Sequence, residues 1–214
     1  TQNRSWTYIM TFTSLQGLSN YIKDFANRKD LSDYTVTNFI NLAQDRATRV
    51  LRIPVLEGYN ENLSISSEGD ISLPQDYIEA KQLTIEHEGC TYELERKPLS
   101  FMTAIRSKTG VPKYFARRGN KLLLAPLNDD ITTAQLYYYI SLDPLENTSD
   151  SNWFVENAAD ILIYGALAEI ALFTKNPEEA QMFEAKFRGA ASEIENMANK
   201  AEFSGSSLRI NPQG

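Results

Sequence analysis

The sequence predicts an α+β protein in which a four-helix bundle is interrupted by a β-rich insert and followed by an extended C-terminal arm. Three observations support this fold class. Apolar residues recur with helical spacing at both ends of the chain, the middle alternates polar and apolar residues between turn signals, and the final residues are mostly polar. We expect the bundle over residues 1–54 and 148–203, the insert over 55–147 and the arm over 204–214.

The composition is that of an ordinary globular protein with an acidic charge balance. The chain has 214 residues, of which 42% are hydrophobic and 23% are charged, so it can bury a core without further cross-links. Its one cysteine, Cys90, excludes an internal disulfide framework and fits a reducing compartment. The formal net charge of −7 argues against a general nucleic-acid binder, which needs cationic groups to displace counterions.

Two helices are expected before the insert. The first begins near Ser14, and its apolar positions at spacings of three and four are Leu15, Leu18, Ile22 and Phe25. The second is the segment DYTVTNFINLAQDRATRVLR, with Asp33 as its expected cap and Pro54 as its end. Leu42 falls outside the apolar face of this second helix.

The middle of the chain reads as short strands and hairpins. Two alternating runs flank Gly69, one hairpin turns near Gly89, and another turns at Gly119-Asn120. A tyrosine-rich strand follows over residues 132–142. Between the hairpins we expect a short helix capped by Ser100.

The stretch NWFVENAADILIYGALAEIALF, residues 152–173, is apolar almost all round and is expected to form one helix. Its densest part is shorter than the roughly 18–20 residues of a membrane span and contains Glu169, so burial in protein is favoured over lipid. A bundle helix keeps one polar face, which this stretch scarcely has. We therefore expect it to be buried partly against a second copy, with the subunit interface residues Leu167, Ile170 and Phe173.

A long last helix and a polar tail complete the chain. Asn176 is a suitable N-cap for the helix and Pro177 suits its first position. In the tail SGSSLRINPQG, Leu208 and Ile210 would lie on one side of an extended segment with Arg209 opposite. Such a segment suits an arm laid on a partner, and a disordered terminus is the alternative.

The chemistry-bearing motifs are few. The sequence has no phosphate-binding glycine loop, no two-histidine metal motif and no nucleophile elbow. His87 lies near Cys90, and residues 128–130 are polar, but both groups are interpreted as turns rather than as a catalytic pair or a cation site. We therefore predict no catalytic residue, cofactor or metal, and no enzyme activity.

Two basic groups could contact phosphate. Arg46, Arg49 and Arg52 are spaced three apart on the expected exposed side of the second helix, and further basic residues cluster around the second hairpin. The candidate phosphate contacts are Arg46, Arg49, Arg117 and Arg118. The alternative is solvated charge or salt bridges, which the acidic balance of the chain favours.

Several short motifs follow one another along the chain. They are Gly110-Val111-Pro112 before an aromatic residue, LLLAP, Tyr137-Tyr138-Tyr139, Pro144-Leu145, Asn152-Trp153-Phe154 and LIYGALAEIALF. Upstream stand Leu73-Pro74-Gln75-Asp76-Tyr77 and NFINLAQDRATRVLR. In order and spacing, over roughly residues 30–200, the chain resembles the head-to-tail adaptor, or connector, proteins of tailed bacteriophages, in particular podovirus-like tail adaptors below the portal. It departs from the family at Leu127, where a second proline is expected after Pro126.

The resemblance implies a structural virion protein made in the host cytoplasm and located at the head-to-tail interface. It implies a homo-oligomeric, twelve-fold ring that contacts the portal protein through its C-terminal segment and the tail tube or nozzle protein, with tail fibres as a further candidate partner. DNA would pass through the ring's channel during ejection without specific recognition, and no membrane is involved.

Two other classes of function remain as alternatives. One is a small DNA-binding regulatory protein that uses the helix carrying Arg46, Arg49 and Arg52, against which the acidic balance weighs. The other, less favoured, is a virion-associated hydrolase, since no carboxylate pair is singled out by its surroundings.

Overall fold

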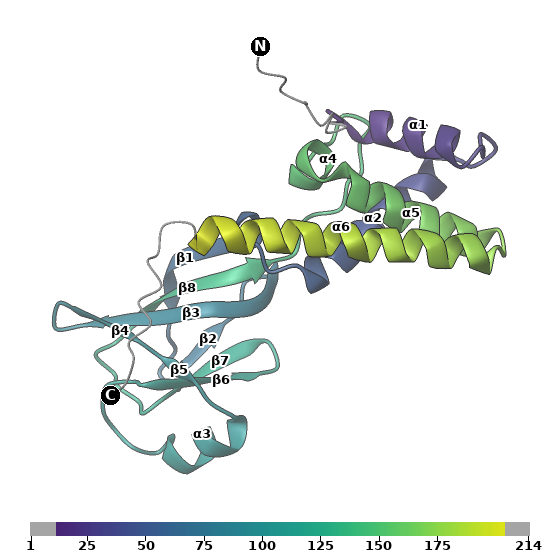
Figure 1. Cartoon of the computed structure of the whole chain (residues 1–214). Helices are drawn as coiled ribbons and strands as arrows, with labels where there is room; N and C mark the ends of the chain where they lie inside the picture. Colours follow the sequence, from purple (N-terminus) through teal and green to yellow (C-terminus); the bar gives the residue numbers. More distant parts are fainter. Residues whose placement is uncertain (1–11, 204–214) are drawn as a thin grey trace, which may run out of the picture. The chain divides into compact units, whose positions relative to one another are not determined.

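The structure of the chain, a computed structural model, describes residues 12–203, without the side chains of residues 201–203. Within these residues, six α-helices and two four-stranded sheets confirm the predicted mixed α+β class (Figure 1). The described chain divides into two compact units. The helical unit combines the segment up to Val55 with the segment from Leu142 onward, and the β-rich unit runs from Leu56 to Ser141.

The helical unit is organised around one central helix. Its elements are α1 (Leu15–Phe25), α2 (Asp33–Val50), α4 (Trp153–Asn157), α5 (Ala159–Phe173) and α6 (Pro177–Phe203). A 3-10 turn, Pro54–Leu56, follows α2. Helix α5 contacts α1, α2 and α6 (Figure 1). The finer prediction of a four-helix bundle stays a prediction, because one of the four expected helices is divided.

Three helix starts can be compared with the expected caps. The Ser14 hydroxyl accepts a hydrogen bond from the Gly17 amide, as the sequence predicts for α1. The expected cap Asp33 is wrong, because Ser32 has the extended backbone of a cap and its hydroxyl accepts from the Thr35 amide. The Asp33 carboxylate is instead paired with Lys23, at 2.6 Å.

At the start of α6, the side chain of Asn176 accepts a hydrogen bond from the Glu179 amide, so this predicted cap is confirmed. The prediction for the short helix α3 (Leu99–Ile105) is wrong. Pro98 stands at its N-cap position, and Ser100 is already inside the helix. Proline has no side-chain acceptor, and α3 has no side-chain cap.

The expected single helix over residues 152–173 is also wrong. Ala158, with φ −143° and ψ 41°, separates α4 from α5. Alanine is the best helix former, so local propensity does not predict a break here. The apolar character of the stretch has a clear reason, since ten of the 15 residues of α5 are buried within the helical unit. The exceptions at its C-terminal end are Leu172 and Phe173.

A glycine allows α5 to approach α2 closely. A Cβ atom built on Gly165 would lie 2.5 Å from the Cβ of Ala43 and 3.2 Å from the ring of Phe187. Real Cβ atoms do not approach so closely, so only glycine fits between these helices without displacing one of them.

The β-rich unit contains two sheets. The first has the order β1-β8-β3-β4 and is antiparallel, with strands β1 (Glu57–Ser64), β8 (Thr133–Ile140), β3 (Tyr77–His87) and β4 (Cys90–Glu93). The second has the order β2-β7-β6-β5, with strands β2 (Asp70–Ser72), β7 (Lys121–Ala125), β6 (Tyr114–Arg118) and β5 (Glu95–Arg96). In it, β5 pairs with β6 in parallel and the other pairs are antiparallel.

Both predicted hairpins are confirmed. Strands β3 and β4 meet at Glu88-Gly89, and strands β6 and β7 meet at Gly119-Asn120. Glu88, Gly89 and Gly119 have φ values of 51°, 76° and 60°, the left-handed conformation that glycine adopts most readily. The turn residues therefore predict the positions of both hairpins from the local sequence alone.

The two sheets share one apolar core. Its residues come from both sheets and include Ile71, Leu83, Ile85, Phe115, Leu122, Leu124, Leu136 and Tyr138. Helix α3 covers the other face of β6 and β7, where Met102 packs with Ala116, Leu123 and Ala125. The β-rich unit is thus a sheet-on-sheet sandwich with one helix on its outer side.

Candidate interaction surfaces

A polar network fastens the segment before α4 to α2. The side chain of Asn41 donates to the carbonyl of Leu145 and accepts from its amide, both at 2.9 Å. The fully buried Gln44 donates to the carbonyl of Asp143 at 2.9 Å and accepts from Asn152 at 2.6 Å. The side-chain amides of Asn41 and Gln44 therefore have hydrogen-bond partners, and the network holds the segment that leads into α4 against α2.

Asn152 has a second role in the same segment. Its side-chain oxygen accepts hydrogen bonds from the amides of Phe154 and Val155, so it caps α4. One residue thus starts the helix and links it to α2. Leu145 and Asn152, which belong to the sequence motifs Pro144-Leu145 and Asn152-Trp153-Phe154, are thus hydrogen-bonded to α2.

Arg46 is the centre of an ion-pair cluster that joins three helices. Its guanidinium contacts Glu169 of α5 at 3.0 Å and pairs with Glu184 of α6. The same group lies 4.6 Å from the ring centroid of Phe187, in cation–π geometry. Only 21% of the Arg46 side chain is exposed. The candidate phosphate contact Arg46 is therefore occupied within the helical unit.

The pKa of the Glu184 carboxylate is lowered within this cluster. Partial burial by itself would raise its pKa, but hydrogen bonds from Arg46 and from Arg188 outweigh burial and leave the pKa below its usual value. The Arg188 contact is 2.9 Å long. The charged form of Glu184 is thus favoured in the folded chain.

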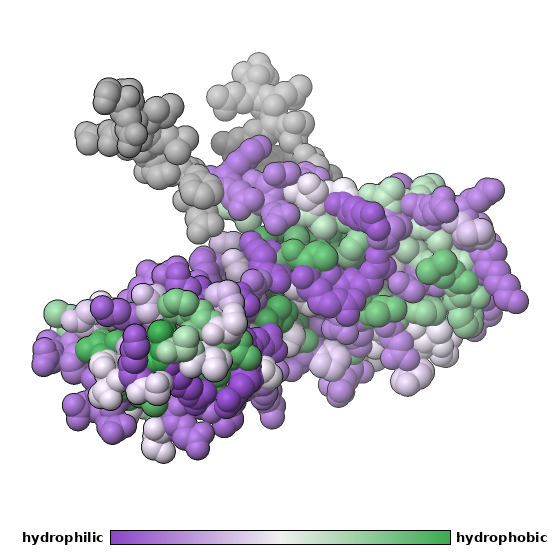
Figure 2. All heavy atoms as spheres, turned by 90° about the horizontal axis from the view of Figure 1, so that it is seen from below, coloured by the Kyte–Doolittle hydropathy of each residue, from purple (hydrophilic) through white to green (hydrophobic). Residues whose placement is uncertain are grey.

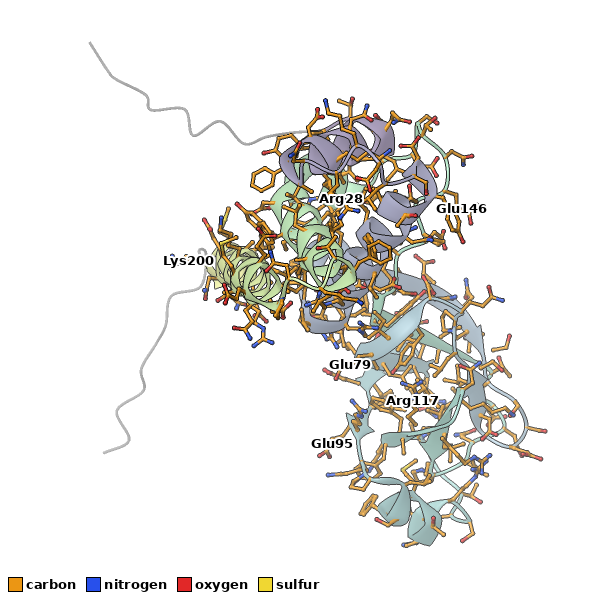
Figure 3. All side chains as sticks on the ribbon, turned by 90° about the vertical axis from the view of Figure 1, so that its right-hand side faces the viewer. Arg28, Glu79, Glu95, Arg117, Glu146 and Lys200 are labelled. Carbon is orange, nitrogen blue, oxygen red and sulfur yellow. The ribbon has the colours of Figure 1, made fainter. Side chains whose placement is uncertain are left out.

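The other arginines predicted to contact phosphate differ in their surroundings. Arg49 is exposed on α2, whereas Arg52 donates to the carbonyls of Leu51 and Arg49 at the end of that helix. Arg117, labelled in Figure 3, belongs to the β-rich unit. It donates to the Gly119 carbonyl at 3.0 Å. The row of three arginines expected on the second helix is therefore not a uniform exposed surface.

A buried carboxylate in the β-rich unit was missed by the sequence analysis. The side chain of Asp70 is 2% exposed and is surrounded by Arg106 at 2.7 Å, Arg118 at 3.3 Å and Lys121 at 3.5 Å. Arg106 also donates to the carbonyl of Glu68 at 2.7 Å. Asp70 thus joins β2, the end of α3 and the β6–β7 hairpin. Arg118, another candidate phosphate contact, is part of this ion-pair group.

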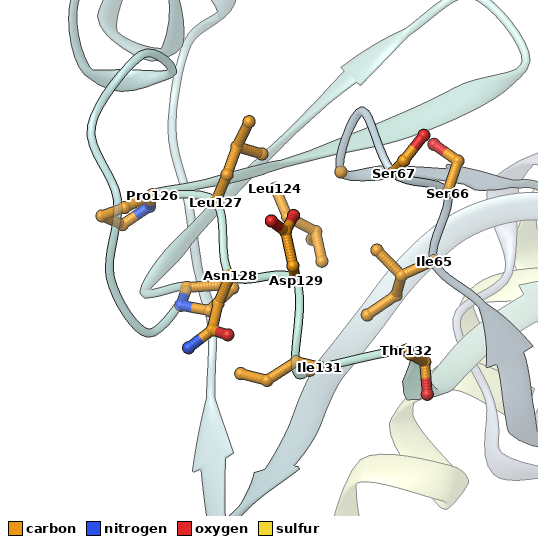
Figure 4. A pocket seen from close by; sticks show the side chains of 12 residues that line it. Ile65, Ser66, Ser67, Leu124, Pro126, Leu127, Asn128, Asp129, Ile131 and Thr132 are labelled. Atoms are coloured by element: carbon orange, nitrogen blue, oxygen red, sulfur yellow. The ribbon is translucent and has the colours of Figure 1, made fainter.

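A small pocket lies beside the polar turn of residues 128–130 (Figure 4). Its volume of about 250 Å³ is below the range of typical organic-ligand sites. Asn128 accepts from the Asp130 amide at 2.9 Å, which is a turn contact. Across residues 12–203, no group of three or more His, Cys, Asp and Glu side chains could hold a metal ion.

Backbone hydrogen bonds in the same loop favour Leu127 over the proline that the family resemblance suggests at this position. The Leu127 amide donates to the Lys108 carbonyl at 3.0 Å, and the Gly110 amide donates to the Leu127 carbonyl at 2.9 Å. A proline has no amide hydrogen and would lose the first of these bonds. The departure from the family pattern is therefore accommodated by a backbone contact.

Exposed apolar side chains gather at the end of α5. The side chains of Leu172 and Phe173 are more than half exposed, and the ring of Phe173 lies 5.9 Å from that of Phe39 on α2. Leu42 is exposed and lies one turn after Phe39 on the same helix surface. These four residues form what we call the Phe173 patch. Figure 2 shows in green the hydrophobic side chains that reach the surface.

The three predicted subunit-interface residues differ in their exposure to solvent. Leu167 and Ile170 are 2% and 3% exposed and lie inside the helical unit, whereas Phe173 is 59% exposed. Of the three, Phe173 alone can reach another molecule without a change in the helical unit. The predicted arm residues Leu208, Arg209 and Ile210 lie outside the described part of the chain.

A larger apolar groove, with a volume of about 640 Å³, lies within the helical unit. Helices α1, α4, α5 and α6 and the turn after α2 contribute its walls. Its lining residues include Tyr21, Phe25, Val55, Trp153, Asp160, Ile163, Tyr164, Glu193, Ile194 and Met197. Phe25 and Met197 are 50% and 63% exposed, so these walls present apolar surface to solvent.

The described residues thus form two units whose interiors are held by hydrogen bonds and ion pairs. Exposed apolar side chains such as Phe173 are expected of a protein that acts through contacts with other macromolecules. The sequence model of the SU10 adaptor proteins matches residues 10–210. The chain belongs to this family of phage head-to-tail adaptors and is a structural component of the virion, which confirms the resemblance. A search of curated proteins gives no match. Among the described helices, none combines the length and hydropathy needed to cross a bilayer.

Proposed function

We propose that the chain forms a ring between the portal and the tail tube or nozzle and extends the DNA channel of the particle. The observation that carries this proposal is the family match over residues 10–210, which includes both compact units. The adaptor role thus concerns the whole chain rather than one module of it. The twelve-fold symmetry is the one implied by the resemblance.

The Phe173 patch is proposed as part of the contact between neighbouring subunits. A ring uses a heterologous interface, in which two different surfaces of each copy meet. Large apolar side chains that are contiguous and exposed are typical of such contacts. Leu172 and Phe173 meet this description, and Leu42 has no other evident reason to be apolar.

The charge balance supports a conduit that does not hold DNA. The net charge is −7, and two of the prominent arginines, Arg46 and Arg118, are paired with carboxylates inside the units. A ring of many acidic copies repels DNA and keeps friction low during ejection. This part of the proposal requires acidic side chains to dominate the channel wall, and a strongly positive wall in an assembled ring would contradict it.

The test is assembly on the portal. Purified protein is added to DNA-filled heads that carry a portal but no tail, and the particles are examined by negative-stain electron microscopy. We expect rings at the portal vertex, and class averages give their symmetry. Heads that remain bare at saturating protein would refute the proposal. A gel-shift titration with duplex DNA at low salt tests the DNA-binding alternative, for which we expect no shift.

A further inference from the structure

We propose that the N-terminal segment, residues 1–11, binds in the apolar groove of its own helical unit. Trp6, Tyr8, Ile9 and Met10 would supply the apolar contacts, and Arg4 would face the carboxylates of the groove. Binding of the segment in the groove requires neither the ring nor the portal. It concerns how each chain covers its own exposed apolar surface.

The groove has the chemistry of a peptide site. Phe25 on α1 and Met197 on α6 are exposed, and Ile163 and Ile194 also line the groove. Two carboxylates, Asp160 and Glu193, stand among these apolar residues. Neither forms an ion pair with any residue in the range 12–203. An apolar groove with a few placed charges is typical of helix-packing peptide sites.

The described chain begins at the margin of this groove. The ring of Phe12 lies 5.4 Å from that of Tyr21, which lines the groove and in turn lies 6.0 Å from Phe25. The Phe12 amide also contacts the Val155 carbonyl at 3.4 Å. The residue that follows the N-terminal segment is therefore already fixed beside the proposed site.

The segment is long enough to fill the groove of its own chain. At about 3.3 Å per extended residue, Met10 reaches about 7 Å from Phe12 and Trp6 reaches about 20 Å. The α6 wall from Ala190 to Met197 measures only about 10 Å at 1.5 Å per residue. A short tether gives a high effective concentration, which favours the chain's own segment over that of a second copy.

The charges of the N-terminal segment and of the groove are complementary. Arg4 is the one charged residue in residues 1–11, and the unpaired side chains in the groove are both acidic. The C-terminal arm is a poorer occupant. Ala198 is the last α6 residue in the lining, and the helix runs on to Phe203 before the arm begins.

Tryptophan fluorescence tests the proposal directly, because the protein has only Trp6 and Trp153. In the Trp153→Phe protein the signal comes from Trp6 alone. Trp153 itself lines the groove, and phenylalanine keeps an aromatic ring there and beside Phe154. We expect emission shifted to the blue and acrylamide quenching several-fold weaker than in a free peptide of residues 1–11. Quenching equal to that of the peptide would overturn the proposal.

Two substitutions in the Trp153→Phe background locate the site. Met197→Lys places a charge in the groove and should make Trp6 markedly more accessible to acrylamide. Met182→Lys is the matched control, because Met182 is also exposed on α6 but does not line the groove. Arg4→Glu should also increase quenching, and Glu193→Arg added to it should restore protection. Equal effects of the two methionine variants would overturn the assignment to this groove.

Two further measurements distinguish other occupants. Protection that is constant over a wide range of protein concentration supports binding within one chain, whereas protection that rises as copies associate would assign the segment to a neighbour and overturn the proposal. Deletion of residues 204–214 should leave the Trp6 signal unchanged. Increased protection of Trp6 after this deletion would show that the arm occupies the groove and would equally overturn it.

Discussion

Arg46 connects three helices through a single side chain, and this makes it the sharpest residue-scale test in the helical unit. Arg46→Met keeps an unbranched apolar stem but leaves Glu169 and Glu184 without their shared cation. Since hydrogen bonds between charged groups contribute about 1.5–3 kcal/mol, we expect the free energy of unfolding to fall by about 2 kcal/mol in urea denaturation. Arg49→Met, on the exposed part of the same helix, should change it by no more than about 0.5 kcal/mol.

The same pair of proteins should show a defined pH dependence. The pKa of Glu184 is lower in the folded chain than the usual value, so its contribution to stability is present above the unfolded pKa and is lost as pH falls through the folded one. The stability difference between wild type and Arg46→Met should therefore be constant near neutral pH and shrink progressively below about pH 4.3. A difference that grows in acid would contradict this account of the cluster.

Asp70 offers a second residue-scale prediction, in the β-rich unit. Asp70→Asn preserves shape but removes the one carboxylate that compensates Arg106, Arg118 and Lys121. Breaking a buried ion pair by removing one partner costs about 3–5 kcal/mol, and we expect the lower end because two of the cations are half exposed. Thermal unfolding followed by circular dichroism measures the loss. Asp130→Asn, at an exposed turn, is the charge-matched control and should shift the midpoint little.

At the scale of elements, the helix starts and hairpins that depend on neighbouring residues could be predicted from the sequence. The hairpins at Gly89 and Gly119 and the starts of α1 and α6 follow from turn glycines and capping side chains that lie within the element itself. The break at Ala158 and the ion-pair groups around Arg46 and Asp70 have no such signal. Asp70 and Arg106, for example, are 36 positions apart, so only the folded chain brings them together.

Two glycines in helices test whether close packing or conformational freedom decides their role. Gly165→Ala adds a methyl group 2.5 Å from the Cβ of Ala43, so α2 and α5 must separate. Overpacking typically costs about 1–3 kcal/mol, and it should exceed the gain of about 1 kcal/mol from the better helix former. The methyl group added by Gly189→Ala in α6 has no neighbouring atom within 4 Å. This substitution should therefore stabilise the protein by about 1 kcal/mol, the difference in helix propensity between glycine and alanine.

The two measurements are made side by side by urea denaturation of the full chain. Opposite signs for Gly165→Ala and Gly189→Ala would support close helix contact as the reason for glycine in α5. Stabilisation by both substitutions would show that α2 and α5 can adjust without cost, and would remove Gly165 as a determinant of the packing.

At the scale of the whole molecule, the apolar stretch of α5 raises the question of what covers it. The helical unit itself covers Leu167 and Ile170, so Leu167→Asp should unfold this unit, at a cost of several kcal/mol, whether or not a ring forms. Such a variant cannot report on subunit contacts. The Phe173 patch can, because Leu42, Leu172 and Phe173 are exposed in the single chain.

Phe173→Asp should leave the unfolding midpoint within the usual range of surface substitutions and weaken ring formation at the portal. The reason is that a charge replaces an apolar side chain at a proposed contact, where it would be desolvated without a partner. Ring occupancy on tail-less heads, counted in micrographs over a protein titration, measures the effect. Met182→Asp is the control, since Met182 is also an exposed apolar residue of the helical unit but lies outside both the patch and the groove. Equal occupancy for wild type and Phe173→Asp would exclude the patch from the interface.

The C-terminal arm gives the last prediction, which concerns attachment rather than folding. All described helices and strands lie within residues 12–203, so deletion of residues 204–214 should leave the far-ultraviolet circular dichroism spectrum and the unfolding midpoint nearly unchanged. Ordering an extended segment costs about 1–2 kcal/mol per residue, so an arm that docks must gain contacts along its length. Leu208 and Ile210 provide two apolar side chains for this purpose.

We therefore expect the truncated protein to remain folded but to bind DNA-filled heads at least tenfold more weakly, as measured by co-sedimentation over a concentration series. Leu208→Ser combined with Ile210→Ser in the full-length chain should reproduce most of the loss, because the arm then keeps its length but not its apolar contacts. Arg209→Ser should have a smaller effect, because residue 209 would lie on the side of an extended segment opposite to Leu208 and Ile210. Wild-type binding by the truncated protein would mean that the portal is held by the described units alone.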